Sequence, residues 1–463
     1  MRKAPIIQII VLTLLIHCVT SQAFAADVYV KGIQSPGELV CPHARDRAGP
    51  TVPRQQQVEP LEVPSRDELR AISEDLLQTL PPSPRETQQK INLNSIAFWG
   101  DSHIAADFFI DGLIAALNIQ RSDVRPRSIP PTMTRGGVRL PLRKFCISDG
   151  WKIQTALSAR SAITNPGPGL ARLENREDDQ DIWIDFRPKD SEARLTRLTI
   201  SFSRIDEIPV EIQVSVDGEP SQQIELGQGQ TELVLHGTQA FSILKLRVLQ
   251  GKLALKNFQP TYLETPKLHL DVYGLPGATI RGWQDIDPDT FSKNFSDVNY
   301  DLVVLEYGTN EAANKNFDAP SYQSMLSNAL RNLKTVFPSS KCLLIGPPDR
   351  GVLISPRKPI QSTRPGNRKK VASQQPRRID TSELLKYSVI HSRIADIQKQ
   401  QAAAFGCQFW DWQAAMGGQG GAYKWFYHSP PLMAKDLIHL TKDGYLESGK
   451  RFARTMGLSH SVR

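Results

Sequence analysis

The sequence of 463 residues predicts an α/β fold, a parallel sheet flanked by helices, which is interrupted by an inserted β-sandwich. Two observations support this prediction. Short apolar runs alternate with helical periodicity around Ile96 and again after Leu268, which is typical of a parallel sheet covered by helices. Between these parts, residues 182–258 alternate apolar and polar side chains with a period of two, as sandwich strands do.

The first 25 residues have the features of a secretory signal peptide. Arg2 and Lys3 precede an apolar run at 6–16, and small residues predict cleavage after Ala25. The run is too short for a good membrane span, and no later segment is long enough. We therefore expect an exported protein that has no stable membrane insertion after signal cleavage.

Residues 26–90 are interpreted as an N-terminal leader segment. The stretch 27–64 is rich in proline and has no period, whereas 66–80 predicts a short amphipathic helix. The domain boundaries are placed where the pattern of apolar residues changes along the chain. The parallel-sheet domain is expected at 91–125 and 266–463, and the inserted sandwich at 126–265.

Four cysteines remain after the predicted cleavage, namely Cys41, Cys146, Cys342 and Cys407. Four cysteines allow three pairings, and export permits disulfides without requiring them. Cys342 and Cys407 each open an apolar run. Cys342 and Cys407 could therefore either form a disulfide between two strands or remain two buried thiols.

The formal net charge of +8 is concentrated in residues 351–378, which contain eight Lys and Arg residues and no acid. Prolines and a low apolar content predict a flexible basic loop within the parallel-sheet domain. Two interpretations of this loop remain: it is a solvated run of charges, or it is an arm that binds polyanions. Since the rest of the chain is balanced in charge, no nucleic-acid partner is expected.

The stretch "IAFWGDSHIAADFF" at 96–109 predicts a strand, a tight turn and a helix. Such a turn exposes one hydroxyl at the edge of a sheet, which makes Ser102 a candidate nucleophile. A serine attacks esters only with a base that takes its proton and a group that orients the base. Asp436 and His439, three residues apart in "DLIHLTKDGY", supply both.

The tetrahedral oxyanion of ester cleavage needs preorganised hydrogen-bond donors. "GLPGATIRGW" and "YGTNEAAN" follow two further predicted strands. Because sites of parallel sheets lie at the carboxyl ends of their strands, these segments are expected beside Ser102. The candidate donors are the backbone N–H groups of Ser102 and Gly277 and the side-chain amide of Asn310.

These segments resemble the motifs of the SGNH, or GDSL-type, hydrolase family. "GDSH", "GLPGATI", "GTNE" and "DLIH" appear in the family order. The resemblance implies a flavodoxin-like sheet, with Ser102 as nucleophile, His439 as base and Asp436 as its partner. It also implies oxyanion donors at Gly277 and Asn310, with Gly274 as the alternative glycine.

More closely, the chain is similar to the periplasmic peptidoglycan O-acetylesterases of Gram-negative bacteria. In that group a sandwich similar to a carbohydrate-binding module separates the Ser and Gly blocks, and "FWDWQAAMGG" and "GTNEA" also match. The resemblance covers the chain from Ile91 onward, apart from the basic loop. It implies a periplasmic esterase that removes the C6 O-acetyl of muramic acid, with O-acetylated peptidoglycan or a related polysaccharide as partner.

Other functions remain open at this level. They are acyl hydrolysis or transfer on another polysaccharide or a lipid ester, and a non-catalytic wall-binding module. Trp425 and Tyr427 in "MGGQGGAYKWFYHSPPL" could stack on a sugar ring or belong to the core. No zinc-like Cys/His spacing, P-loop or dinucleotide fingerprint is present, so no metal and no cofactor are expected.

Overall fold

The structure is a computed structural model that describes residues 24–41, 61–70, 73–77, 91–156, 163, 165–313, 316–355 and 380–460. Most of the predicted signal peptide and of the basic loop 351–378 lie outside these residues. Within the described part of the chain, no helix combines the length and the apolar character that a membrane crossing requires.

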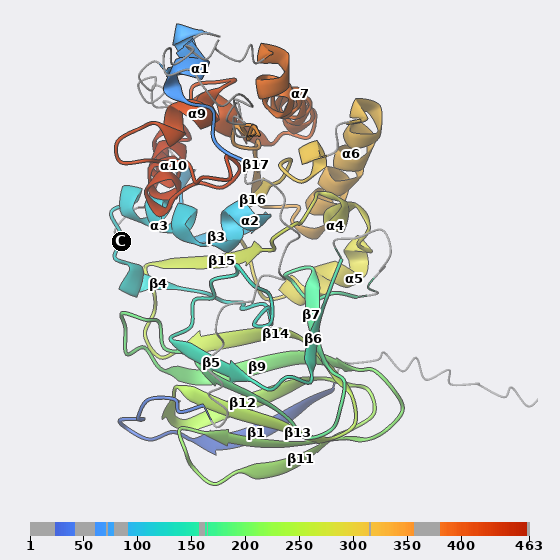
Figure 1. Cartoon of the computed structure of the whole chain (residues 1–463). Helices are drawn as coiled ribbons and strands as arrows, with labels where there is room; N and C mark the ends of the chain where they lie inside the picture. The colour runs from blue at the N-terminus through green and yellow to red at the C-terminus, as the bar shows by residue number, and fades with distance from the viewer. Residues whose placement is uncertain are drawn as a thin grey trace, which may run out of the picture.

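One unit is a β-sandwich, seen in the lower half of Figure 1. Its two sheets have the strand orders β1-β12-β9-β14-β7-β6 and β11-β10-β13-β8-β5, and apolar side chains from both sheets form one core. The strands are β1 (Phe24–Lys31), β5 (Lys144–Ile147), β6 (Trp151–Thr155), β7 (Ala171–Asn175), β8 (Gln180–Asp185), β9 (Leu195–Arg204), β10 (Val210–Val216), β11 (Gln222–Leu226), β12 (Gln230–Phe241), β13 (Ile243–Gln250) and β14 (Leu253–Tyr262).

The other unit is a parallel sheet with the order β18-β17-β16-β3-β15-β4. Taken in chain order without the edge strand β4, this is the 2-1-3-4-5 order of flavodoxin-like folds. The α/β fold class with an added sandwich is thus confirmed. The strands are β3 (Ser95–Gly100), β4 (Val124–Arg125), β15 (Leu268–Gly274), β16 (Leu302–Glu306), β17 (Lys341–Ile345) and β18 (Gln408–Trp410), while β2 (Ile91–Asn92) pairs with β19 (Leu458–Ser459) in a separate ladder.

Helices cover both faces of the parallel sheet (Figure 1). On β3, Ile96 and Phe98 point into one apolar core and Ala97 and Trp99 into another, so the strand is buried on both sides. The helices, including short 3-10 turns, are α1 (Arg66–Arg70), η1 (Glu74–Leu77), α2 (Ser102–Ala105), α3 (Phe108–Ala116), η2 (Arg121–Asp123), α4 (Arg281–Gln284), α5 (Pro288–Ser292), η3 (Lys293–Phe295), η4 (Glu311–Ala313), α6 (Ala319–Val336), α7 (Thr381–Ala404), α8 (Trp412–Ala415), α9 (Gly421–Phe426) and α10 (Lys442–Thr455).

The start of the expected leader differs from its description as an aperiodic segment. Residues 24–31 form β1, which pairs in parallel with β12 of the sandwich. Val28 and Val30 point into the sandwich core, and this burial stabilises the strand. Further along, α1 and η1 fall within the helix expected at 66–80, and residues 71, 72 and 78–80 lie outside the described part.

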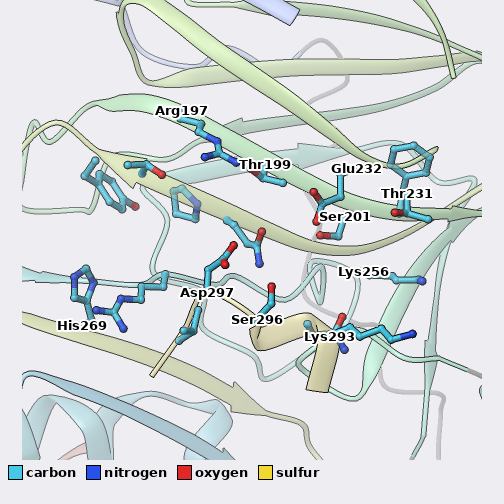
Figure 2. Close-up of a pocket in the computed structure, with 18 of the residues that line it drawn as sticks. Arg197, Thr199, Ser201, Thr231, Glu232, Lys256, His269, Lys293, Ser296 and Asp297 are labelled. Carbon is cyan, nitrogen blue, oxygen red and sulfur yellow. The ribbon is translucent and has the colours of Figure 1, made fainter. Parts of the chain in front are cut away.

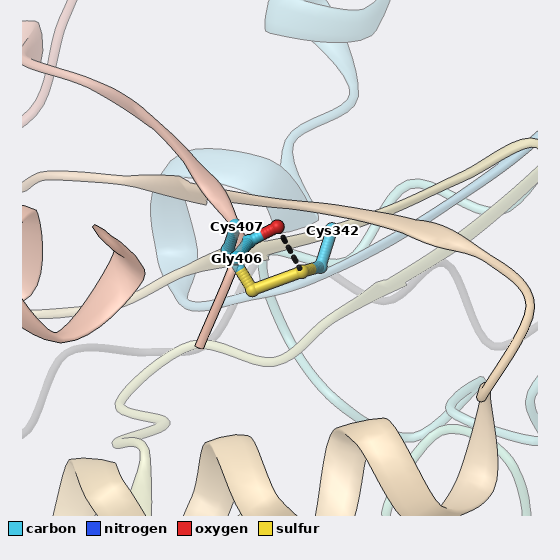
Figure 3. The surroundings of a disulfide bond; sticks show 3 residues. All are labelled: Cys342, Gly406 and Cys407. Carbon is cyan, nitrogen blue, oxygen red and sulfur yellow. Dashed lines mark hydrogen bonds between the residues drawn. A yellow bond between two sulfur atoms is a disulfide. The ribbon is translucent and has the colours of Figure 1, made fainter. Parts of the chain in front are cut away.

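Two disulfides join distant parts of the chain. Cys41 pairs with Cys146 of β5, which fastens the segment after β1 to the second sheet of the sandwich. Cys342 of β17 pairs with Cys407, which precedes the edge strand β18, and Figure 3 shows this bridge beside Gly406. Cys342 and Cys407 therefore form a disulfide between neighbouring strands and are not buried thiols.

Candidate active site

Ser102 lies at the carboxyl end of the central strand β3, where the chain turns into α2. Asp101 is the N-cap of this helix, since its carboxylate accepts a hydrogen bond of 2.9 Å from the His103 backbone N–H. The close approach of α2 to the sheet needs glycine at the end of β15. A Cβ on Gly274 would lie 2.3 Å from the Ala105 nitrogen.

Ser102, His439 and Asp436 form a continuous hydrogen-bonded chain. The Ser102 hydroxyl Oγ is 3.0 Å from Nε2 of His439, and Nδ1 of the same ring is 2.8 Å from Oδ2 of Asp436. Because ionised Asp436 can only accept, Nδ1 carries the ring proton and Nε2 is left to accept the serine proton. The three side chains thus have the geometry of a nucleophile, a base and an orienting carboxylate.

A strained turn fixes the Asp436–His439 segment. Oδ1 of Asp436 accepts hydrogen bonds of 2.9 Å from the backbone N–H groups of Ile438 and His439. Leu437 between them has φ 56°, an unusual value for a bulky residue, and its side chain is fully buried in the core. Backbone strain held in place by core packing is typical of functional sites.

The electrostatics of the site keep Asp436 ionised and make His439 more basic. Burial acts to raise the pKa of Asp436, but the hydrogen bonds from the His439 ring and from two backbone N–H groups lower it to about 2. The hydrogen bond to Asp436 in turn raises the pKa of His439 above its usual 6.5. His439 accepts the serine proton only in its neutral form.

We predict that kcat/KM for a small acetate ester falls as the pH drops through an apparent pKa above 6.5, because His439 then becomes protonated. The measurement is a pH profile of kcat/KM at constant ionic strength. In Asp436→Asn the residual activity should also fall in acid, but with a lower apparent pKa than in wild type. The hydrogen bond to the carboxylate that raises the pKa of His439 is gone in this variant. An acid limb at the same pH in both enzymes would contradict this assignment.

Two backbone N–H groups at the site are available to bind an oxyanion. Among the described residues, neither the Ser102 N–H nor the Gly277 N–H donates a backbone hydrogen bond. Gly277 is exposed and has φ +84°, a backbone conformation that favours glycine. Gly274 is buried and packs against α2. Of the two glycines, Gly277 therefore remains the candidate donor.

Asn310 follows β16 and lies beside the nucleophile turn. Its side-chain Nδ2 donates to Oδ2 of Asp101 at 3.1 Å and to the Ala278 carbonyl at 2.8 Å. Both amide hydrogens are thus engaged in the unliganded site. An oxyanion role for Asn310 requires that the substrate replace or share one of these contacts.

A buried pair of carboxyl groups, Asp101 and Glu306, supports the nucleophile turn, and the sequence analysis did not single out Glu306. Glu306, the last residue of β16, is fully buried, and its Oε2 accepts a hydrogen bond of 3.2 Å from the Asp101 backbone N–H. Burial and the nearby Asp101 carboxylate raise the pKa of Glu306 well above its usual value. Burial also raises the pKa of Asp101, to about 6. Glu306 is therefore held as the neutral acid beside Asp101.

Glu306→Gln should retain most of the esterase activity, because a neutral amide replaces a neutral acid. Its stability should respond differently to pH. A carboxyl whose pKa is raised by folding contributes stability below its unfolded pKa of 4.5, and this contribution is lost as the pH rises toward the folded pKa. From about pH 5 to about pH 8 the free energy of unfolding of Glu306→Gln should thus rise relative to wild type.

Denaturant unfolding at several pH values measures this difference. Glu225→Gln, which changes an exposed carboxylate on β11, is the matched control. A constant difference between Glu306→Gln and wild type across this range would show that Glu306 is not held neutral.

Two more charged or titratable groups surround the triad. His103 is buried, its Nδ1 lies 3.0 Å from the Tyr445 hydroxyl of α10, and burial lowers the pKa of His103 well below 6.5. Arg350, which follows β17, lies over the Tyr387 ring at 4.1 Å. Its positive charge acts to lower the pKa of His439, and the negative charge of Asp436 acts to raise the pKa of Arg350. Arg350 therefore places a cation close to the catalytic groups.

Of the two roles left open for Trp425, stacking on a sugar and a place in the core, the structure has the core. Trp425 on α9 is 0% exposed and belongs to the apolar core, so neither ring face is open to a ligand. Tyr427 is partly exposed, but Arg66 covers one face of its ring at 4.9 Å and its hydroxyl donates to the Pro64 carbonyl. The aromatic segment thus packs α9 against the start of α1.

Within the described ranges, no group of three or more His, Cys, Asp or Glu side chains is arranged to hold a metal ion. Near Ser102, the Asp101 carboxylate instead accepts hydrogen bonds from the His103 backbone N–H and the Asn310 side-chain amide, and Oε2 of Glu306 accepts one from the Asp101 backbone N–H.

Comparisons with known proteins agree with this geometry at the level of the fold. No protein-family model and no curated protein matches the chain. A solved structure described as a peptidoglycan O-acetylesterase is 20% identical, covers 78% of this chain and 90% of its own, and has a TM-score of 0.55. A family 2 carbohydrate esterase with a carbohydrate-binding domain, from Corynascus thermopiles (Myceliophthora fergusii), is 11% identical over 65% of this chain and 97% of its own, with a TM-score of 0.26.

An acetylxylan esterase from Geobacillus stearothermophilus is 16% identical over 42% of this chain and 76% of its own, with a TM-score of 0.27. Because the second and third TM-scores are low, no argument rests on them. The first likeness spans both the parallel-sheet domain and the sandwich. Together with the strand order, it shows that this chain shares the fold of that solved structure.

Proposed function

We propose that this protein is an exported serine esterase that removes O-acetyl groups from cell-wall carbohydrate in the periplasm. The observation that supports it most strongly is the chain of hydrogen bonds from Ser102 through His439 to Asp436, next to two unpaired backbone donors. The amino-terminal signal-like sequence supports export.

The proposed reaction has two acyl-transfer steps. In the first, Oγ of Ser102 attacks the acetyl carbonyl carbon while its proton passes to Nε2 of His439. The bond between the carbonyl carbon and the sugar oxygen then breaks, and that oxygen leaves with the proton from Nε2. In the second, water gives a proton to Nε2 and attacks the acetyl-serine, which releases acetic acid and restores the Ser102 hydroxyl.

Two features favour an acidic polysaccharide, and specifically the C6 O-acetyl of muramic acid in peptidoglycan. The similar structure with the highest TM-score of those described above is itself a peptidoglycan O-acetylesterase. Arg350 provides a positive charge beside the catalytic groups, which would attract a substrate that carries carboxylates.

The test is acetate release from O-acetylated peptidoglycan beside acetylated xylan at equal ester concentration. The proposal expects faster release from peptidoglycan and none above background with Ser102→Ala. Faster release from xylan would contradict the proposed substrate but not the assignment of the catalytic triad. A preference for eight-carbon over two-carbon small esters would overturn the carbohydrate assignment.

A further inference from the structure

A polar groove of about 730 Å³ lies where the sandwich faces the parallel-sheet domain. One wall is the outer face of β9, β12 and β14, and the other is formed by α5, η3 and the segment that follows them. Contacts fix the two units in place across this junction. The Ser128 backbone N–H donates to Asp271 of β15, and Asn294 of η3 donates to the Pro166 carbonyl.

Among the described residues, no group forms an ion pair with one of the lysines in the groove. Lys256 on β14 lines the groove and is only 7% exposed. Within the part of the chain that the structure describes, its ammonium donates no hydrogen bond and joins no ion pair. The charged group that acts on it is a like charge, Arg172, and together with burial it lowers the pKa of Lys256 to about 8. A buried ammonium without a partner is unfavourable unless an anion or another acceptor binds it.

The local backbone directs Lys256 toward the groove. The register between β14 and β9 shifts between Leu255 and Asn257, which leaves Lys256 at a bulge. Leu255 and Phe258 on either side pack in the sandwich core, whereas Lys256 lines the groove. Bulges re-aim side chains in this way and are frequent next to functional sites.

The rest of the groove offers hydroxyl and amide groups together with charged groups of both signs, namely Arg127, Arg197, Glu232, Glu264 and Asp297. Thr199 and Ser201 of β9 and Gln259 of β14 lie on the same polar strand face. Lys293 of η3 adds a second ammonium on the opposite wall, and Figure 2 shows the Lys256 and Lys293 side chains extending in the same direction in that view. Such a lining matches a ligand with many hydroxyls and a carboxylate.

We propose that this groove is a second binding site, which takes a carboxylate-bearing saccharide unit with its carboxylate on Lys256 and Lys293 and its hydroxyls on Thr199, Ser201 and Gln259. The site is distinct from the catalytic one. His269, near the start of β15, lines the groove, whereas Gly277 follows the end of that strand. A strand of this length spans about 20 Å. The groove and the catalytic site therefore contact different parts of a polymeric substrate, and the ester that is cleaved lies at the catalytic site.

The test is calorimetric titration of the Ser102→Ala protein, which rules out turnover and makes the result independent of the esterase reaction. The probes are the disaccharide of N-acetylglucosamine and N-acetylmuramic acid, which carries a carboxylate, and di-N-acetylchitobiose, which does not. We expect binding of the acidic disaccharide and roughly tenfold weaker binding after Lys256→Met, because a charge-assisted hydrogen bond is lost.

Lys256→Arg should restore binding, and Lys252→Met, which changes an exposed lysine just before β14, should leave it unchanged. In the active enzyme, Lys256→Met should raise KM for the acidic polymer and leave kcat/KM for a small acetate ester unaltered. No binding of the acidic disaccharide, equal binding of the neutral one, or unchanged binding by Lys256→Met would each overturn the proposal. Binding of triglutamate in place of the sugar would show a peptide site instead.

Discussion

Ser102→Ala will lower kcat for acetate esters by about a million-fold if Ser102 is the nucleophile, and the oxyanion donors and substrate binding will leave a small residual rate above the uncatalysed reaction. The reason is geometric. The Ser102 hydroxyl is the group at hydrogen-bond distance from Nε2 of His439, and alanine leaves that nitrogen without a proton to accept. The removed atom is at a half-buried position, so the fold should persist.

Thermal unfolding of Ser102→Ala beside wild type checks that the fold is intact. The double variant with His439→Ala should be no slower than either single variant, because the two side chains act as one unit. Additive losses in the double variant would mean that Ser102 and His439 act independently. Full activity of folded Ser102→Ala would exclude it as the nucleophile.

Asp436→Asn should lower kcat by about ten-thousand-fold, since an amide in place of the carboxylate can hold the His439 ring in the wrong tautomer. The side-chain amide can donate to Nδ1, which would place the ring proton on Nε2, where the serine proton has to go. The Asn side chain can still accept from the backbone N–H groups of Ile438 and His439. The turn should thus survive the substitution.

The measurement is single-turnover kinetics with a chromogenic acetate. Asp289→Asn, an exposed carboxylate on α5, is the control for an unspecific effect of removing one negative charge. A loss of less than about tenfold in Asp436→Asn would show that the carboxylate does not orient the base.

The sequence predicts much of the fold because the central strands are buried on both sides. "SIAFWG" and "LVVLE" are read as apolar runs, and the structure buries every residue of β3 and β16. The carboxyl ends of parallel strands share one edge of the sheet. This places the segments with Ser102, Gly277 and Asn310 near one another even though they are far apart in the sequence.

Other features depend on contacts that no local pattern contains. The residues of β1 begin within the last two positions of the predicted signal peptide, and only pairing with β12, about two hundred positions later, makes them a strand. The bridge between Cys41 and Cys146 spans 105 residues, and four cysteines do not indicate their pairing. Trp425 lies in a segment of mixed composition, and its burial is decided by the helices that enclose it.

Glu306 and Lys256 show the same limit for charged residues. Glu306 ends an otherwise apolar strand and Lys256 follows the apolar run at 253–255, which is a signal that a sequence can give. Whether such a charge is protonated, paired or open to a ligand depends on its neighbours. For Glu306 the neighbour is Asp101, and for Lys256 it is a groove wall from another domain.

The most direct test of the central claim is to trap the acyl-enzyme. The protein is mixed with an excess of a chromogenic acetate, quenched in acid within milliseconds, digested and examined by mass spectrometry. The account predicts one acetyl group on the peptide that contains Ser102, with a burst of the chromophore equal to the enzyme concentration if deacetylation is slower than acetylation. It predicts neither in Ser102→Ala. Acetylation of another residue at the burst stoichiometry, with Ser102 unmodified, would contradict it.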